Sequence, residues 1–444
     1  MRWLLLIGLG VVTCARAAQA DDWTDCYQAK AAGDRIAACQ RTMATGIFSP
    51  KDAAGLHRTL GDAYGEQRNL RAALAEYNEA LVLNPQDGRA YLARGVLHHL
   101  LGKTDAALYD LGRALTIDPG AKGAYFRRGE IYREAGKLEQ AIADYSRLIE
   151  MEPTVDSYYD RRGRAYLGLE QWDKALADYD RAIALKPKDG TYLWLRGRVN
   201  REQGKLERAI ADYNAAAALR PDFAEIYLHR GIAYNDKSEF DKAIADFDRV
   251  IASAGKGPLG DEALSQRGVA HAGRGDNAAA IADYDKAIVR RPKFAEAFFH
   301  RANAYHDMQK FERAVRDFST AIEFKPDYAD AYHNRAVAYG DMGEFAKAID
   351  DYTKTIALRP DDAAPYNGRA WAYFKSGKGA EGLLDVEQAL RINPQYEPAF
   401  DTRGHIYEAL GRKEDAIADF RKALAINPNI PESVEGLKRL EAQP

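Results

Sequence analysis

Hydrophobic and small residues recur along most of this chain with a period of 34 residues. Within one period they fall at positions 4, 8 and 11 and again at positions 20, 24 and 27, with polar residues between them. Spacings of three and four residues keep such side chains on one face of a helix, so each period predicts two amphipathic helices. A glycine is frequent near position 15, between the two stretches, and indicates a turn. The pattern therefore predicts a chain of helical hairpins.

Prolines mark the register of the repeat. They lie 34 residues apart, except for one step of 71 residues that equals two steps plus three residues. The series consists of Pro85, Pro119, Pro153, Pro187, Pro221, Pro292, Pro326, Pro360, Pro394 and Pro428. When this proline is placed at position 32, where it ends the second helix, residues 54–430 form eleven units. The sixth unit contains the extra residues, in the segment IASAGKGPLGDEA.

The residue types at the periodic positions indicate how the hairpins pack. Position 4 is usually Tyr or Phe, position 8 is Gly or Ala, and position 11 is mostly Tyr. Position 20 is Ala in ten units, position 24 is mostly aromatic and position 27 is mostly Ala. We expect the small residues to let the two helices of a hairpin approach, and the aromatic residues to fill the space between hairpins. One hairpin cannot bury these faces alone, which explains the repetition.

In unit length, small positions, aromatic positions and terminal proline, the eleven units resemble tetratricopeptide repeats (TPR). The resemblance implies an all-α fold, a right-handed superhelical solenoid of antiparallel helix hairpins with a concave groove. It also implies that positions 2, 5, 9, 12 and 13 of the first helix, helix A, face the groove. Proteins of this family commonly bind protein or peptide partners there.

The first twenty residues, MRWLLLIGLGVVTCARAAQA, predict a secretory signal peptide. Arg2 precedes an apolar run from Trp3 to Val12, and Ala18-Gln19-Ala20 is typical of a cleavage site. We therefore expect residues 1–20 to be removed and the protein to be exported, to the periplasm of a Gram-negative bacterium or outside the cell. Cleavage after Ala17 and a lipid anchor on Cys14 are alternatives. The mature chain has no segment apolar enough to span a membrane.

Residues 21–53 form a degenerate unit before the array, and residues 431–444 a single capping helix after it. In the first segment Cys26 and Cys39 fall where the two helices of a hairpin come closest. Because an exported chain meets oxidising conditions, we expect them to form a disulfide. A metal site or a redox pair is the alternative, but neither has further ligands or a C-x-x-C motif nearby. In the last segment Val434, Leu437 and Leu440 are expected to cover the final unit.

Ten consecutive units have Arg at position 7 and Asp at position 23. The pairs are Arg94 and Asp110, Arg128 and Asp144, Arg162 and Asp178, Arg196 and Asp212, Arg230 and Asp246, Arg267 and Asp283, Arg301 and Asp317, Arg335 and Asp351, Arg369 and Asp385, and Arg403 and Asp419. An antiparallel hairpin brings position 7 near positions 21–23, so we interpret the series as structural ion pairs. A row of arginines binding a polyanion is the alternative.

Composition and motifs argue against catalysis and against nucleic acid. The chain has 63 Lys and Arg against 66 Asp and Glu, so it lacks the basic excess of nucleic-acid binders. Gly255-Lys256 lacks the remaining residues of a phosphate-binding loop, and no hydrolase, metalloprotease or calcium-loop motif is present. The nine histidines show no metal-ligand spacing. We expect no enzyme activity, no cofactor and no metal.

The groove positions differ between units, as expected of a recognition surface. Two stretches combine aromatic with polar residues. Units three to five offer Phe126, Arg133, Arg164, Trp194, Arg198 and Arg201, and units eight to ten offer Phe299, Asn303, His306, Trp371 and Phe374. Aromatic residues beside Arg are typical of binding hot spots, which favours units three to five. Asn303 and Asn334 resemble part of a carboxylate-binding TPR site, but Phe299, Ala364 and Gly368 replace its cations.

We interpret the protein as a non-catalytic scaffold that binds protein or peptide partners through the groove. The alternative is an accessory subunit for assembly or export of the cell envelope or of surface polysaccharide, in which groove aromatics would stack on sugars.

Overall fold

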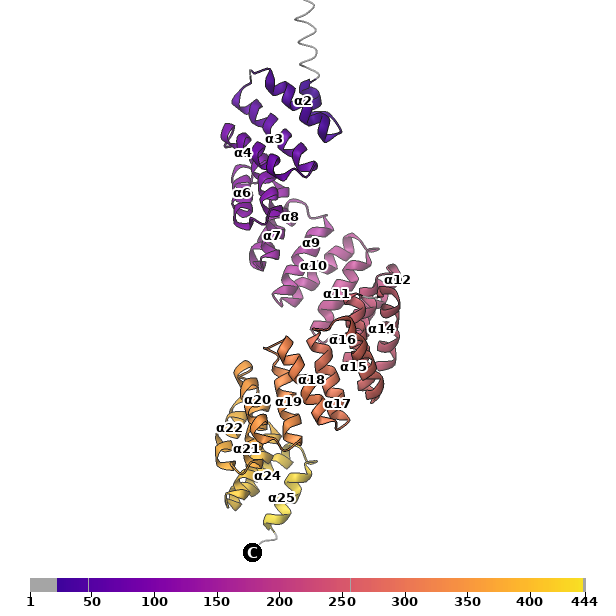
Figure 1. The fold of residues 1–444 in the computed structure, drawn as a ribbon, viewed down its shortest axis with the longest axis vertical. Helices are drawn as coiled ribbons and strands as arrows, with labels where there is room; N and C mark the ends of the chain where they lie inside the picture. Colours follow the sequence, from indigo (N-terminus) through magenta and orange to yellow (C-terminus); the bar gives the residue numbers. More distant parts are fainter. Residues whose placement is uncertain (1–21, 47, 256, 442–444) are drawn as a thin grey trace, which may run out of the picture. The chain divides into compact units, whose positions relative to one another are not determined.

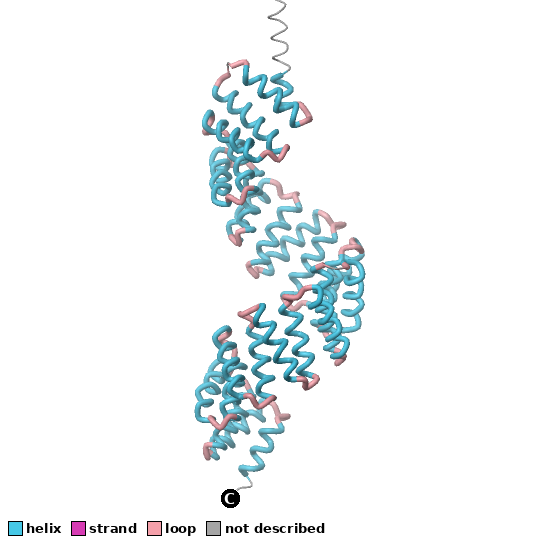
Figure 2. Tube along the Cα trace, viewed as in Figure 1, coloured by secondary structure: helices cyan, strands magenta, loops and turns pink. Residues whose placement is uncertain are grey.

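The computed structural model describes residues 22–441, apart from residues 47 and 256. Throughout this described part the regular secondary structure is helical (Figure 2). The prediction of an all-α solenoid of hairpins is therefore confirmed. The predicted signal peptide lies outside the described residues.

The chain divides into two compact bodies, Met1–Lys205 and Leu206–Pro444, and each is described by itself. In the first body residues 22–28 are helical, and each later helix contacts the next one along the chain. The helices are α2 (Ala32–Ala44), α3 (Pro50–Glu66), α4 (Leu70–Leu83), α5 (Gly88–Leu100), α6 (Thr104–Ile117), α7 (Lys122–Glu134), α8 (Leu138–Met151), α9 (Asp156–Gly168), α10 (Trp172–Leu185) and α11 (Gly190–Glu202).

The second body continues the same arrangement, as Figure 1 shows for successive helices. Its helices are α12 (Leu206–Leu219), α13 (Ala224–Asp236), α14 (Phe240–Ala254), α15 (Pro258–Gly273), α16 (Asn277–Arg290), α17 (Ala295–Asp307), α18 (Phe311–Phe324), α19 (Ala329–Asp341), α20 (Phe345–Leu358), α21 (Ala363–Lys375), α22 (Gly379–Ile392), α23 (Glu397–Ala409), α24 (Lys413–Ile426) and α25 (Pro431–Glu441). Helix A of a unit is odd-numbered from α3 to α23, and helix B follows it.

The turn inside each hairpin is built around position 15, which has a positive φ in all eleven units. Glycine occupies it in seven units, for example Gly102 and Gly343, and adopts this conformation without a steric penalty. Arg68, Glu170, Ser238 and Gln309 occupy it in the other four units with φ between 56° and 60°. The predicted turn glycine is thus explained by backbone geometry, although the turn also forms at some cost without it.

Small residues at position 8 accommodate the aromatic ring at position 24 of the same hairpin. A Cβ atom added to Gly268 would lie 2.5 Å from the ring of Tyr284, and one added to Gly404 would lie 2.6 Å from the ring of Phe420. The rings at position 24 are among the most deeply buried large side chains. The small residue at position 8 therefore makes room for the ring at position 24. We had expected it to let the backbones of the two helices approach each other.

The two ends of the array are closed differently. At the N-terminal end Cys26 and Cys39 form the predicted disulfide, and both are fully buried beside Leu56 and Leu60 of α3. At the C-terminal end Leu437 and Leu440 of α25 pack on the last hairpin, around Phe420. Each end thus covers an apolar surface of a terminal hairpin, which open helical arrays require.

The predicted arginine–aspartate pairs are confirmed, and they have a further feature. In nine pairs the guanidinium donates two hydrogen bonds to the two carboxylate oxygens. The residues of the tenth pair, Arg196 and Asp212, belong to different bodies. Arg335, for example, donates from Nε and Nη2 to Asp351, each at 2.7 Å. Its remaining nitrogen, Nη1, donates to Ser319 at 2.8 Å, and Ser319 belongs to helix B of the preceding unit.

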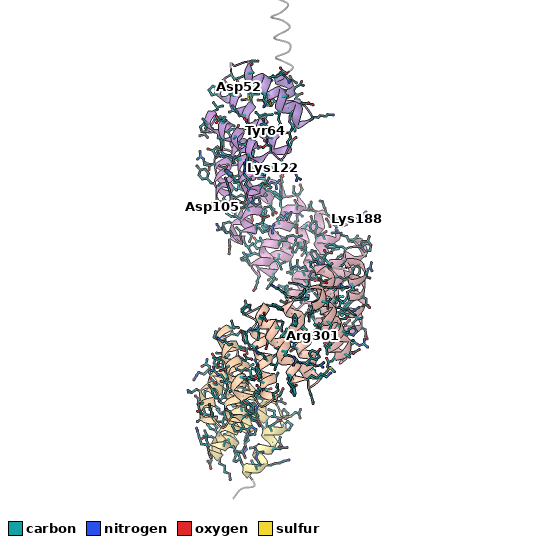
Figure 3. The ribbon with its side chains drawn as sticks, viewed as in Figure 1. Asp52, Tyr64, Asp105, Lys122, Lys188 and Arg301 are labelled. Carbon is teal, nitrogen blue, oxygen red and sulfur yellow. A yellow bond between two sulfur atoms is a disulfide. The ribbon has the colours of Figure 1, made fainter. Side chains whose placement is uncertain are left out.

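This contact to the preceding unit recurs along both bodies and joins neighbouring hairpins. The acceptor is always at position 25 and is a short polar residue. The contacts are Arg94 to Asn78, Arg162 to Ser146, Arg196 to Asp180, Arg230 to Asn214, Arg267 to Asp248, Arg301 to Asp285, Arg335 to Ser319 and Arg369 to Thr353. Figure 3 labels Arg301, whose Nη1 lies 2.5 Å from Asp285. One side chain therefore holds its own hairpin together and attaches it to the one before. We call this arrangement the arginine bridge.

The bridge carries a desolvation cost. Burial raises the pKa of the Asp144 carboxyl above its ordinary value, although Arg128 donates two hydrogen bonds to it. The pKa of Asp178 is raised for the same reason. A buried pair of this kind adds little net stability compared with apolar residues, but removing one partner leaves a charge buried alone.

We predict that Arg335→Ala destabilises the units around it by about 3 kcal/mol, because Asp351 would stay buried without its guanidinium. Hydrogen exchange of the backbone amides in α18 to α20 measures this loss of local stability. A local measurement is needed because a repeat array need not unfold in one step. Arg316→Ala is the matched control, since Arg316 is exposed on α18. Equal effects of the two substitutions would show that the bridge does not stabilise the array.

We also predict that reduction of the Cys26–Cys39 disulfide destabilises the N-terminal hairpin by about 2–4 kcal/mol, because the reduced segment gains conformational freedom when unfolded. Hydrogen exchange of α2 and α3 should accelerate on reduction, while that of α19 and α20 should not change. Unchanged exchange of α2 would contradict a stabilising role of the disulfide.

Candidate partner-binding surface

The aromatic candidates in units three to five lie against neighbouring side chains. Trp194 is only 9% exposed, and the guanidinium of Arg198 lies 5.3 Å from the centre of its ring. Phe126 packs against Tyr158 at 6.3 Å between ring centres and borders the apolar cluster around Tyr145. Trp194, a predicted groove residue, is therefore largely buried and offers little apolar surface.

The arginines of the same stretch have acidic partners. Arg133 lies 3.4 Å from Glu130, which also contacts Arg161. Arg164 donates to Asp160 at 2.8 Å, one helical turn earlier. Arg201 donates to Glu202 at 3.0 Å. These intramolecular pairs reduce the positive charge that units three to five offer to a partner.

In units eight and nine three candidates are engaged with neighbours in the second body. Phe299 packs on Tyr328 and Phe318, with ring centres 4.9 and 5.9 Å away. Asn303 accepts a hydrogen bond from Asn334 at 2.9 Å, so the two amides bind one another. His306 lies 2.8 Å from Asp341 of the next unit. The contacts of Asn303 and His306 link α17 to α19, two adjacent A helices.

Trp371 and Phe374 form an aromatic group with His405 on the following helix A. The rings of Trp371 and Phe374 lie 5.2 Å apart, and His405 lies 5.7 Å from Trp371 and 6.0 Å from Phe374. The ammonium of Lys375 lies 5.5 Å from the ring of Trp371. Trp371 also lines a cavity in the second body.

That cavity has a volume of about 360 Å³ and opens between units nine and ten. We call it the C-terminal socket. Its defining residues are Gly340, Asp341 and Phe345 from unit nine and Gly368, Trp371 and Lys375 from unit ten. Tyr352 of α20 and Val337 of α19 complete the wall.

A second cavity, of about 440 Å³, occupies the equivalent place between units one and two, and we call it the N-terminal socket. Its corresponding residues are Gly65, Glu66 and Leu70 from unit one and Ala93, Val96 and Leu100 from unit two. Asp62 and Tyr77 take the places of Val337 and Tyr352. Both sockets are therefore formed by positions 9, 12, 13, 17 and 24 of one unit and positions 6, 9 and 13 of the next.

Sequence reasoning missed the N-terminal socket, although a signal was present. Position 12 is glycine only in units one and nine, at Gly65 and Gly340. Position 6 is alanine or glycine only in the units that follow them, at Ala93 and Gly368. Each socket lies at a junction between two units where position 12 of the first unit has no side chain and position 6 of the second has at most a methyl group. A search for side chains that are present overlooks a site of this kind.

The described part of the chain lacks both a cluster of metal ligands and a membrane-spanning helix. No group of three or more His, Cys, Asp or Glu residues is placed there to hold a metal ion. No described helix is both long enough and apolar enough to cross a membrane.

Comparison with protein families supports the interpretation of the repeats. Profiles described as TPR repeat match residues 197–238, 268–309 and 302–343, and profiles described as tetratricopeptide repeat match residues 58–122, 123–155, 157–189, 329–362 and 402–430. Together these matches cover more than half of the chain. No curated protein matches the chain.

Several solved structures are similar. A tetratricopeptide repeat protein from Parabacteroides merdae is 23% identical, with a TM-score of 0.44 over 57% of this chain and 99% of that one. MamA is 28% identical, with a TM-score of 0.34 over 37% of this chain and 95% of that one. The Cut9–Hcn1 hetero-tetramer structure contains a chain that is 12% identical, with a TM-score of 0.48 over 92% of this chain and 93% of that one. With its repeat profiles, its hairpins and its arginine–aspartate packing, the chain belongs to the tetratricopeptide repeat family.

Proposed function

We propose that the protein is an exported, non-catalytic scaffold that binds protein partners through the helix-A face, meaning positions 2, 5, 9, 12 and 13 of helix A. The proposal rests on the contrast between positions of the repeat that are constant and positions that vary from unit to unit. Positions 7, 8, 20, 23 and 24 are nearly constant and are used for packing within and between hairpins. The helix-A positions of this face vary from unit to unit, so they can distinguish one part of the array from another and select a partner.

Export is supported by the signal-like first twenty residues and by the disulfide. Cys26 and Cys39 are bonded to each other in the core of the N-terminal hairpin. Such structural disulfides persist in oxidising compartments and are rare in the cytosol. The periplasm of a Gram-negative bacterium satisfies both features. Mass spectrometry of the protein recovered from its native compartment tests the proposal, which expects a mature chain that begins at Asp21.

We predict that a photo-crosslinking residue at position 100 captures protein partners and that one at position 109 captures several-fold less. Leu100 lies on the helix-A face of unit two and is 66% exposed, whereas Tyr109 lies on helix B of the same unit and is 63% exposed. The two residues are therefore about equally exposed and differ in whether they lie on helix A or on helix B. The yield of specific protein adducts in the native compartment is the measurement.

The outcome of this comparison separates the candidate functions. Adducts mainly from position 109 would contradict binding through helix A. Purified surface polysaccharide that binds the protein and is displaced by no protein partner would favour the envelope-accessory role, with Trp371 and Phe374 stacking on sugar rings. Turnover that a single side-chain substitution abolishes would contradict the non-catalytic assignment.

A further inference from the structure

The two sockets exist because two glycines contribute nothing to packing. A Cβ atom added to Gly65 or Gly340 would meet no atom within 4 Å. Neither glycine has the positive φ that favours this residue type. By contrast, a Cβ atom on Gly368 would lie 2.5 Å from Tyr352, so that glycine is needed for packing. In a helix interior glycine is less favourable than alanine by about 1 kcal/mol. The fold therefore gives no reason for glycine at position 12 in units one and nine.

Both sockets combine large apolar side chains with polar and charged groups. Leu70, Leu97 and Tyr77 line the N-terminal socket, and Leu100 at its rim is 66% exposed. Phe345, Tyr352 and Trp371 line the C-terminal socket. Volumes of about 440 and 360 Å³ are within the range of ligand-binding cavities. A socket with this lining suits a large apolar side chain, which is the usual anchor in a protein interface.

The charge at the N-terminal socket is negative. Asp62 and Glu66 line the socket, and Glu66 forms an ion pair with Arg35. Asp62 is exposed and accepts a hydrogen bond from the Tyr77 hydroxyl at 2.7 Å, and none of the described cations forms an ion pair with it. One carboxylate is thus available to a cation on a partner.

The charge available at the C-terminal socket is positive. Asp341 lines the socket, and its carboxylate is occupied by a hydrogen bond with Nε2 of His306 at 2.8 Å. Lys375 is exposed and lies over the ring of Trp371, and no carboxylate in the described chain lies within ion-pair distance of it. An ammonium beside an aromatic wall is thus available to a carboxylate on a partner.

We propose that the sockets are two anchor sites of the same shape and opposite charge preference for a protein partner. The N-terminal socket takes a large apolar side chain flanked by Lys or Arg, and the C-terminal socket takes one flanked by Asp or Glu. This inference rests on the proposed scaffold function and names the chemistry of what is bound.

The experiment uses the full mature chain and two fluorescent nonapeptides. The basic probe has one Phe between two Lys, and the acidic probe has one Phe between two Glu, in an otherwise Gly and Ser sequence. Gly65→Leu and Gly340→Leu each fill one socket, and Leu167 already occupies position 12 in unit four without disturbing the repeat. Gly112→Leu is the control, because its Cβ also has open space but lies on helix B, outside both sockets.

We predict that Gly65→Leu weakens the basic probe at least tenfold and leaves the acidic probe unchanged, and that Gly340→Leu does the reverse. Gly112→Leu should change neither affinity, and all three variants should melt at or above the temperature of the unchanged protein. Lys375→Glu should make the C-terminal socket prefer the basic probe. Fluorescence anisotropy gives the dissociation constants.

Loss of charge selectivity, or normal binding to a filled socket, would overturn the proposal. The outcome is separable from that of the scaffold function. If Gly65→Leu and Gly340→Leu still crosslink partners from position 100 in normal yield, the sockets are not the anchors and the scaffold stands. If the unchanged protein crosslinks no protein, the scaffold function fails, whatever the probes bind.

Discussion

The arginine bridge is the interaction on which the array depends. One guanidinium at position 7 binds both carboxylate oxygens of position 23 in its own hairpin and a short polar side chain at position 25 of the hairpin before it. Apolar packing alone allows neighbouring helices to slide, because it has no direction. A planar group with hydrogen bonds on two sides sets the position of one unit relative to the next. The net stability gained is small, but the geometry is specified.

This arrangement separates the positions that build the protein from those that can recognise a partner. Helix A contributes the arginine at position 7 and the small residue at position 8. Helix B contributes the aspartate at position 23, the ring at position 24 and the polar acceptor at position 25. The helix-A positions 2, 5, 9, 12 and 13 vary between units, so the fold does not depend on one residue type there. Local departures from the repeat, such as the glycines of the two sockets, are where we propose that the chain recognises a partner.

Sequence reasoning recovered the hairpins, the disulfide and the arginine–aspartate pairs because each follows from a short-range or periodic pattern. It missed the contact of Arg335 with Ser319, which joins positions 7 and 25 of different units and requires the units to be placed side by side. It did not foresee that Trp194 is largely buried, with the guanidinium of Arg198 beside its ring. The sockets were missed because they result from the absence of side chains on both sides of a junction.

The central claim is that packing positions are constant so that the helix-A face is free to bind. Hydrogen exchange of the mature chain, alone and in complex with a partner isolated by crosslinking, tests it most directly. The account predicts slower exchange in the second halves of α3, α5, α19 and α21 on binding, with α4, α6, α20 and α22 unchanged. Protection concentrated on those four B helices, with the A helices unaffected, would contradict it.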